Sequence, residues 1–239
     1  MGIVKTKGII IAENNLNDYD KMLTILTPGM GKIGCVAKGA RKTKSLLLAG
    51  TQFLCFGDYM LYKSGDIYSM NSCEIIEVFY NLRVDLDKLK YAVHITKIIN
   101  DVTTENQNIY KTLKLYLNTL YMIAERDMDL NLLVSTFKLR LVSMLGFMPK
   151  IKECTNCKTE EDLTCFSIQD NGFKCTACGK QDKSSIQMQA TIKDTIRYII
   201  SVPSEKLYSF KINREAAKEL EIISKIYFNE KLEKEYKIE

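Results

Sequence analysis

The sequence contains no apolar run that approaches the ~20 residues needed to cross a bilayer. It has no signal-peptide core, because Lys5 and Lys7 interrupt the first apolar residues. It also lacks a Gly-Lys-Ser/Thr phosphate loop, a paired-carboxylate metal site and a nucleophile elbow. These absences predict a soluble, cytoplasmic protein with no membrane contact and no enzymatic activity. In that compartment cysteine thiols stay reduced, so the eight cysteines need an explanation other than disulfides.

Histidine is almost missing, and His94 is the single one. It lies within a helical pattern, and no Ser or Cys nucleophile motif accompanies it. We therefore expect a structural or incidental imidazole rather than a catalytic one. The rest of the composition, 46% hydrophobic and 26% charged, is that of a globular chain, and 239 residues suffice for one large domain or two to three small ones.

Acidic residues are absent from a whole window, residues 21–57. The same window contains six basic residues: Lys21, Lys32, Lys38, Arg41, Lys42 and Lys44. Because the whole chain carries +5 and this window carries +6, the remaining residues sum to −1. Charge concentrated in this way is typical of a site for a polyanion. The alternative is a solvated basic loop with no partner.

The first 80 residues alternate short β-rich stretches with turn residues. The predicted strands cover residues 3–4, 8–11, 22–27, 33–37, 52–63 and 67–78, with a hairpin turn at 63–66. Both faces of these strands are partly apolar, which favours a small closed barrel such as the OB-fold over an open sheet.

After Tyr80 the apolar residues recur at the period of a helix. The first predicted helical face contains Leu86, Leu89, Val93 and Ile99, widened by Ala92, Ile95 and Ile98. The next two contain Tyr110, Leu113, Leu117, Leu120 and Ala124, and Leu130, Val134, Phe137, Leu141 and Met144. Gly146 and Pro149 end the third helix. The helical period resumes with Ile192, Ile196 and Ile199, and a last helix is capped by Asn213. The sequence therefore predicts a helical bundle.

Two Cys-x-x-Cys pairs interrupt the helices at Cys154, Cys157, Cys175 and Cys178. Each pair presents two thiolates from one tight turn, and a hairpin between the pairs brings four sulfurs together. This is the tetrahedral set that zinc favours, and four protein ligands leave no position open for substrate. We expect one structural Zn²⁺. Cys165, Cys35, Cys55 and Cys73 are expected to be small buried residues.

Several ordered motifs resemble one family, the bacterial recombination mediators called RecO. They are Lys7-Gly8-Ile9-Ile10, Asp20-Lys21-Met22-Leu23-Thr24, Thr27-Pro28-x-x-Gly31-Lys32 and Ala37-Lys38-Gly39-Ala40-Arg41-Lys42. A helical bundle interrupted by a four-cysteine element follows in the same order, so the resemblance covers nearly the whole chain.

The resemblance implies an OB-fold that binds single- and double-stranded DNA, in a cytoplasmic protein associated with the nucleoid. It also implies annealing of complementary strands and loading of the recombinase onto strands coated by single-strand-binding protein. The implied partners are RecR and the acidic C-terminal tail of single-strand-binding protein. Two alternatives stay open: a zinc-ribbon module that acts on RNA or the transcription machinery, and a metal-dependent nucleic-acid enzyme.

The expected fold is α+β. It comprises an OB-fold DNA-binding domain over residues 1–80, a helical domain over 81–149, a four-cysteine zinc-ribbon-like element over 150–185 and a second helical part over 186–239. The expected DNA-binding residues are Lys32, Lys38, Arg41, Lys42, Lys44, Phe53 and Tyr59. The lysines and the arginine would meet phosphates, and the aromatic rings would stack on bases unless the barrel core buries them.

Overall fold

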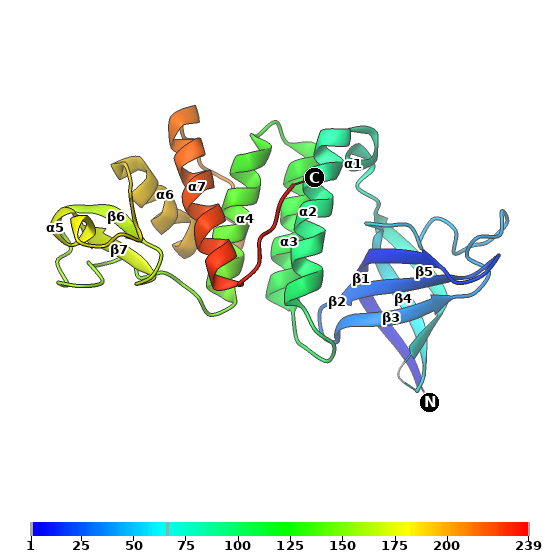
Figure 1. Cartoon of the computed structure of the whole chain (residues 1–239). Coiled ribbons are helices and arrows are strands. Elements are labelled where there is room, and N and C mark those ends of the chain that lie inside the picture. The colour runs from blue at the N-terminus through cyan, green and yellow to red at the C-terminus, as the bar shows by residue number, and fades with distance from the viewer. Residues whose placement is uncertain (1, 66, 239) are drawn as a thin grey trace. The chain divides into compact units, whose positions relative to one another are not determined.

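A computed structural model describes residues 2–65 and 67–238 of the chain. The fold is α+β, as predicted, and forms two compact units that divide after Glu125 (Figure 1). The first three helices thus belong with the barrel, whereas the predicted boundary at residue 80 placed them in a separate domain. Among the described residues, no helix is long and apolar enough to cross a membrane.

The first unit begins with a closed barrel of five strands. They are β1 (Gly2–Asn15), β2 (Lys21–Thr27), β3 (Gly31–Ala37), β4 (Phe56–Ser64) and β5 (Ile67–Glu77), in the order β1-β2-β3-β5-β4. The first part of β1 pairs with β4 and its second part with β2, while a parallel β3–β5 contact completes the barrel. This is the predicted OB-fold.

Two of the strand predictions need correction. The two stretches predicted within residues 3–11 are one continuous strand. The strand predicted to start at Gln52 starts at Phe56, because the chain turns through Leu54 with a positive φ of 63°. The hairpin predicted at 63–66 is present, since Ser64 pairs with Ile67. Asp66 itself lies outside the described residues.

The helices of the first unit are α1 (Tyr80–Val84), α2 (Leu86–Val102) and α3 (Tyr110–Glu125). Asp85 caps α2 by accepting hydrogen bonds from two backbone N–H groups. The predicted α2 face is confirmed at Ala92, Ile95, Ile98 and Ile99, which are fully buried, and is wrong at Leu86 and Val93, which are 75% and 45% exposed. His94 is buried on the same helix.

The β2–β3 turn is fastened to the loop between α2 and α3. The backbone N–H of Lys32 donates to Thr104 O at 3.1 Å, and that of Asn106 donates to Met30 O at 2.9 Å. Gly31 has a φ of +67°, and a Cβ there would lie 2.1 Å from Thr104 O. Only glycine meets both demands, so this motif residue has a structural role.

The second unit contains α4 (Leu130–Met144), α6 (Ala190–Ser201) and α7 (Arg214–Lys231), with a short 3₁₀ turn at Ser204–Lys206. Asn213 caps α7 as predicted, with its Oδ1 accepting from Ala216 N at 2.8 Å. Ile192, Ile196 and Ile199 are fully buried.

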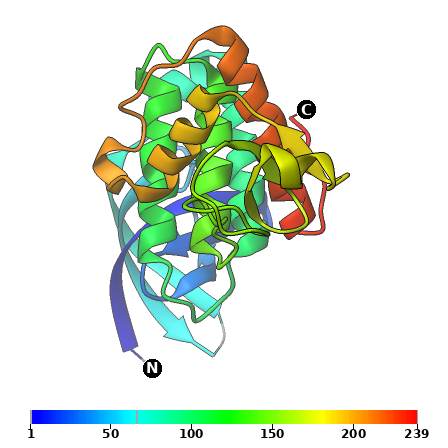
Figure 2. The same ribbon diagram turned by 90° about the vertical axis from the view of Figure 1, so that its left-hand side faces the viewer.

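Between α4 and α6 lies the small cysteine element, which comprises β6 (Leu163–Ser167), β7 (Gly172–Cys175), α5 (Thr176–Lys180) and β8 (Ser185–Gln187). Figure 2 shows its hairpin facing the viewer. β6 is the central strand, with β7 and β8 on its two sides, and the sequence pattern did not predict β8.

Candidate nucleic-acid interface and metal centre

The basic residues of the barrel lie mainly in the β3–β4 loop, residues 38–55. Successive turns shape it: Lys42 N donates to Gly39 O, Ser45 N to Lys42 O and Leu48 N to Ser45 O, at 2.9 to 3.2 Å. Lys38, Arg41, Lys42 and Lys44 are all exposed. The loop is therefore a folded turn with four basic side chains on its surface.

The β3–β4 loop is held against the β1–β2 turn, residues 16–20. Arg41 donates from its backbone N–H to Tyr19 O at 2.9 Å and from Nη1 to Asn17 O at 2.6 Å. Lys42 Nζ lies 5.3 Å from the centre of the Tyr19 ring. Arg41 and Lys42 thus stabilise the loop as well as contributing positive charge.

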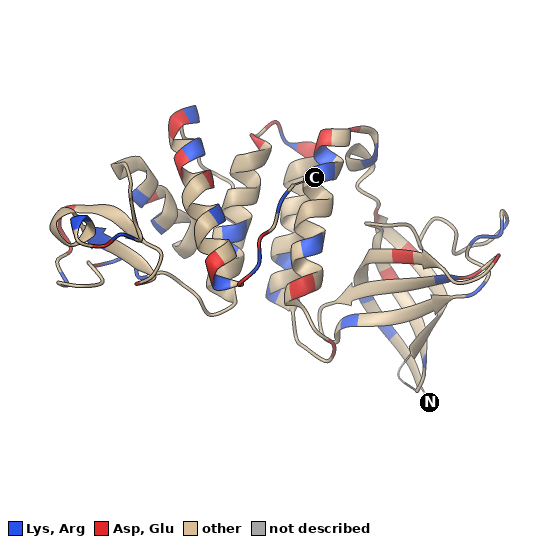
Figure 3. Ribbon diagram, in the orientation of Figure 1, with Lys and Arg blue, Asp and Glu red and all other residues tan. Residues whose placement is uncertain are grey.

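Acidic residues lie closer to this loop than the sequence window implies. Asp20 Oδ1 accepts from Gly39 N at 2.7 Å. That hydrogen bond, and then one from Asn17, lowers the pKa of Asp20, and the charges of Lys38 and Lys42 act in the same direction. Figure 3 shows basic and acidic segments together at the right-hand end of the barrel. The positive charge of the loop surface is therefore partly offset by a neighbouring carboxylate.

Lys32 does not belong to this surface, although it was predicted as a DNA ligand. Its Nζ donates to Asn100 O at 2.8 Å and to Asn100 Oδ1 at 3.2 Å, in the last turn of α2. A cation is favourable at that helix end. Lys32 and Lys38 lie at opposite ends of β3, roughly 20 Å apart at about 3.3 Å per residue. The ammonium of Lys32 therefore joins the barrel to α2.

The prediction that Tyr59 stacks on bases is wrong. Its side chain is 0% exposed within the barrel core, and its hydroxyl donates to Cys55 O at 2.9 Å and Gly50 O at 3.2 Å. Phe53 is half-buried and lies in the loop before β4. Its carbonyl accepts from Arg83, which ties the loop to α1.

The sequence reasoning missed the outer face of β2 and β3, which we define as Met22, Thr24, Gly34 and Val36. Met22 pairs with Val36 and Thr24 with Gly34, and all four are half-buried. A Cβ on Gly34 would meet nothing within 4 Å. A glycine within a strand often marks a place where a ligand approaches closely. Gly34 was therefore the residue from which this face could have been suspected in the sequence. The face leads along β3 to Lys38.

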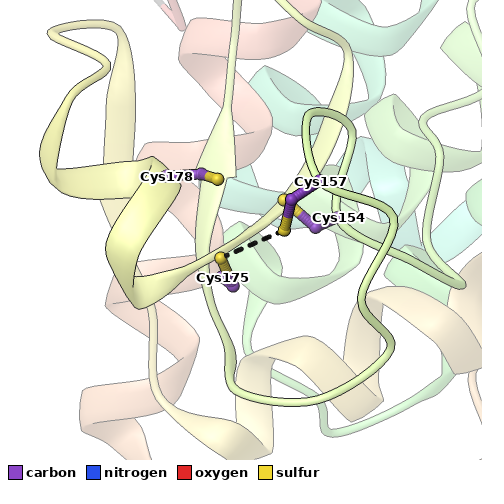
Figure 4. A group of neighbouring side chains, drawn as sticks. All are labelled: Cys154, Cys157, Cys175 and Cys178. Atoms are coloured by element: carbon purple, nitrogen blue, oxygen red, sulfur yellow. Dashed lines mark hydrogen bonds between the residues drawn. The ribbon is translucent and has the colours of Figure 1, made fainter.

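The four predicted metal ligands come together in the second unit (Figure 4). Their sulfurs all lie within 4.8 Å of one another, and those of Cys157 and Cys175 are 3.7 Å apart. Tetrahedral zinc, with Zn–S of about 2.3 Å, requires S–S distances of about 3.8 Å. The set therefore fits a metal ion with four sulfur ligands.

The surroundings of the sulfurs also suit a cation. Burial opposes ionisation of Cys154, but backbone N–H groups of both knuckles outweigh it and lower its pKa to about 6. The Thr159 N–H lowers the pKa of Cys157, yet the neighbouring sulfurs prevail and raise it to about 11. Close thiols thus resist ionising together, and a central cation would remove that repulsion.

Cys165 lies under the second knuckle. A Cβ on Gly179 would be only 2.4 Å from its sulfur, so Cys165 packs against Gly179 as a small buried residue. Beside it, Lys174 is buried and forms ion pairs with Asp170 and Asp182. These contacts fix the hairpin that carries Cys175.

Comparison with known families accounts for both units. The family model "Recombination protein O N terminal" matches residues 1–79, and "Recombination protein O C terminal" matches residues 83–238. The chain belongs to the Recombination protein O family. The two family models meet near residue 80, so the family boundary differs from the division of the compact units after Glu125.

Curated relatives agree with this assignment. A protein named DNA repair protein RecO from Acetivibrio thermocellus is 40% identical, over 99% of this chain and 94% of its own length. RecO proteins from Alkaliphilus metalliredigens and a Thermoanaerobacter species are 32% and 30% identical, over 88% and 99% of this chain and 86% and 96% of theirs. The similarity covers the barrel and the helical unit alike.

Proposed function

We propose that this protein is a mediator of DNA repair and homologous recombination. It binds single- and double-stranded DNA, anneals complementary strands and, with RecR, helps load the recombinase onto strands coated by single-strand-binding protein. Membership of the Recombination protein O family along nearly the full chain carries this proposal. No observation favours the alternative of a zinc-ribbon module acting on RNA or transcription. The site of action is the cytoplasm, at the nucleoid.

The DNA runs along the outer face of β2 and β3 and onto the β3–β4 loop. Lys38, Arg41, Lys42 and Lys44 meet phosphates there and release counterions, which gives affinity without sequence choice. The open surface at Gly34 lets the strand approach the sheet closely, as OB-folds allow on this face. Among the expected aromatic contacts, only Phe53 retains exposed surface.

Annealing requires no covalent step. Neutralising the charge of two strands lowers their repulsion, and the Asp20 carboxylate, whose charge acts on Lys38 and Lys42, weakens the contacts of these two lysines with phosphates. Bases can then exchange partners until complementary ones pair. The four cysteines hold a structural Zn²⁺ with no position open for substrate. No residue is therefore assigned a catalytic role.

The acidic tail of single-strand-binding protein fits a groove in the second unit. The groove lies between α4, α7 and residues 236–238, and its charged residues are three lysines, Lys138, Lys225 and Lys237, and one acidic residue, Glu221. Burial, and then the charge of Lys225, lowers the pKa of Lys138 to about 8. An anionic partner would offset the unfavourable free energy of a buried cation that lies beside a second cation. This groove therefore favours the acidic tail.

A strand-annealing assay on DNA coated by single-strand-binding protein tests the proposal. We expect faster annealing that needs no nucleotide and leaves both strands intact. The RNA alternative would be favoured if the protein bound structured RNA but neither bound nor annealed DNA strands.

A further inference from the structure

The β3–β4 loop presents an apolar side chain among its basic ones. Leu46 is 96% exposed, the highest value for a large hydrophobic side chain among the described residues. It lies between exposed Lys44 and the partly exposed Leu48. Burial of this apolar surface against a ligand would be favourable. Leu46 is therefore the apolar side chain of this basic loop with the most surface available to a ligand.

The loop holds Leu46 outward by anchoring its neighbours. Leu47 packs against the hydrophobic core of the barrel. The carbonyl of Leu47 accepts from Thr51 N at 3.1 Å and Thr51 Oγ1 at 2.8 Å. Ser45 Oγ accepts from Leu47 N at 3.2 Å. With residues 45 and 47 fixed on either side, Leu46 projects from a built turn.

The charges around Leu46 decide which ligand covers it. Arg41, Lys42 and Lys44 share the loop, so a molecule that reaches Leu46 meets positive charge first. A nucleic acid matches both features of the loop. Its phosphates are attracted to the basic side chains, and the flat apolar faces of its bases can contact Leu46. Leucine is among the side chains that proteins insert between stacked bases.

We propose that Leu46 is an apolar wedge that inserts against the bases of the bound strand and separates neighbouring bases. The inference rests on the DNA binding proposed above and adds to it a base contact. Unstacked bases keep their pairing edges free, which suits annealing. The wedge acts on base faces, so its contribution is independent of sequence and nearly independent of salt.

The test uses a single-stranded oligonucleotide with 2-aminopurine at successive positions, whose fluorescence rises when the base unstacks. Leu46→Ala should weaken binding about fivefold or more, abolish the fluorescence rise and leave the salt slope of binding unchanged. Leu46→Phe should restore both affinity and fluorescence. Leu86→Ala is the matched control, because Leu86 is also strongly exposed, at 75%, but lies on α2.

Two results overturn the wedge, and they are distinguishable. If Leu46→Ala keeps full affinity and fluorescence while loss of the loop lysines still flattens the salt slope, the DNA-binding proposal stands and Leu46 has no part in it. If the unaltered protein shows no salt-dependent binding, the proposed function fails together with the wedge. Because Leu46 is exposed, its replacement should leave the fold intact.

Discussion

Replacing Lys38 and Lys44 together by alanine should make DNA binding less sensitive to salt. Both side chains are exposed on the β3–β4 loop. With four loop cations on phosphates at ~0.7 per contact, log affinity for single strands falls with log salt at a slope near −3. Between 50 and 200 mM salt, binding of the unaltered protein should weaken roughly 50-fold. Removing two contacts should shrink the slope by about 1.4.

The choice of residues follows from the loop geometry. Replacing Arg41 and Lys42 should also shrink the slope by about 1.4, with an additional salt-independent loss, because both residues hold the loop to the β1–β2 turn. Binding is measured by fluorescence anisotropy across a salt series, with unfolding followed in parallel.

The control is Lys231→Ala with Lys234→Ala, which removes the same charge from the second compact unit. Acidic neighbours Glu230, Glu233 and Glu235 balance those lysines in sequence. If both double variants lost the same DNA affinity, the β3–β4 loop would have no specific role, because binding would then respond to net charge alone.

The remaining predictions concern the metal, the sheet and the groove. Cys154→Ser or Cys178→Ser should remove a single zinc per chain and unfold the cysteine element; metal analysis that finds no zinc in the unaltered protein, with four thiols titrating freely, would contradict this. Gly34→Val should weaken DNA binding roughly tenfold, about 1.4 kcal/mol, without loss of stability, because its Cβ meets open space and its bulk would keep the strand from the sheet; unchanged affinity in the same anisotropy assay would remove the outer face from the DNA path. Lys138→Met should raise the free energy of unfolding by on the order of 1–3 kcal/mol at pH 7 while weakening binding of an acidic tail peptide. The folded pKa of Lys138, about 8, lies below its ordinary 10.5, so the cost of its buried charge is full below pH 8 and disappears as the pH rises to 10.5. Denaturant unfolding at pH 7 and pH 10.5 measures this, and a gain that is equal at both values would argue against it.

The barrel and the cysteine cluster were predictable because their signals are local. Period-two strands with turn residues between them define an OB-fold, and two Cys-x-x-Cys pairs at ribbon spacing define a four-sulfur site. The position of Asn213 before an apolar helix likewise predicted its cap. Each of these depends on residues near one another in sequence.

What the sequence could not reveal are the contacts between distant segments. Lys32 looks like part of a basic cluster until α2 supplies Asn100 as its partner, 68 residues further along the chain. The acid-free window begins directly after Asp20, and the fold returns that carboxylate to Gly39. Tyr59 follows the alternation of a strand, which does not reveal which face is the interior. The sequence pattern selects candidate DNA-binding residues, and the tertiary contacts of each side chain decide whether it is available to DNA.

The decisive measurement is the annealing of complementary strands coated by single-strand-binding protein. A recombination mediator should accelerate annealing without nucleotide and leave both strands intact. The Lys38→Ala, Lys44→Ala variant should be slower. On uncoated strands, where the groove proposed for the acidic tail takes no part, the Lys231→Ala, Lys234→Ala control should match the unaltered protein. Strand cleavage, dependence on nucleotide hydrolysis, or equal rates for the unaltered protein and the Lys38→Ala, Lys44→Ala variant would contradict this function.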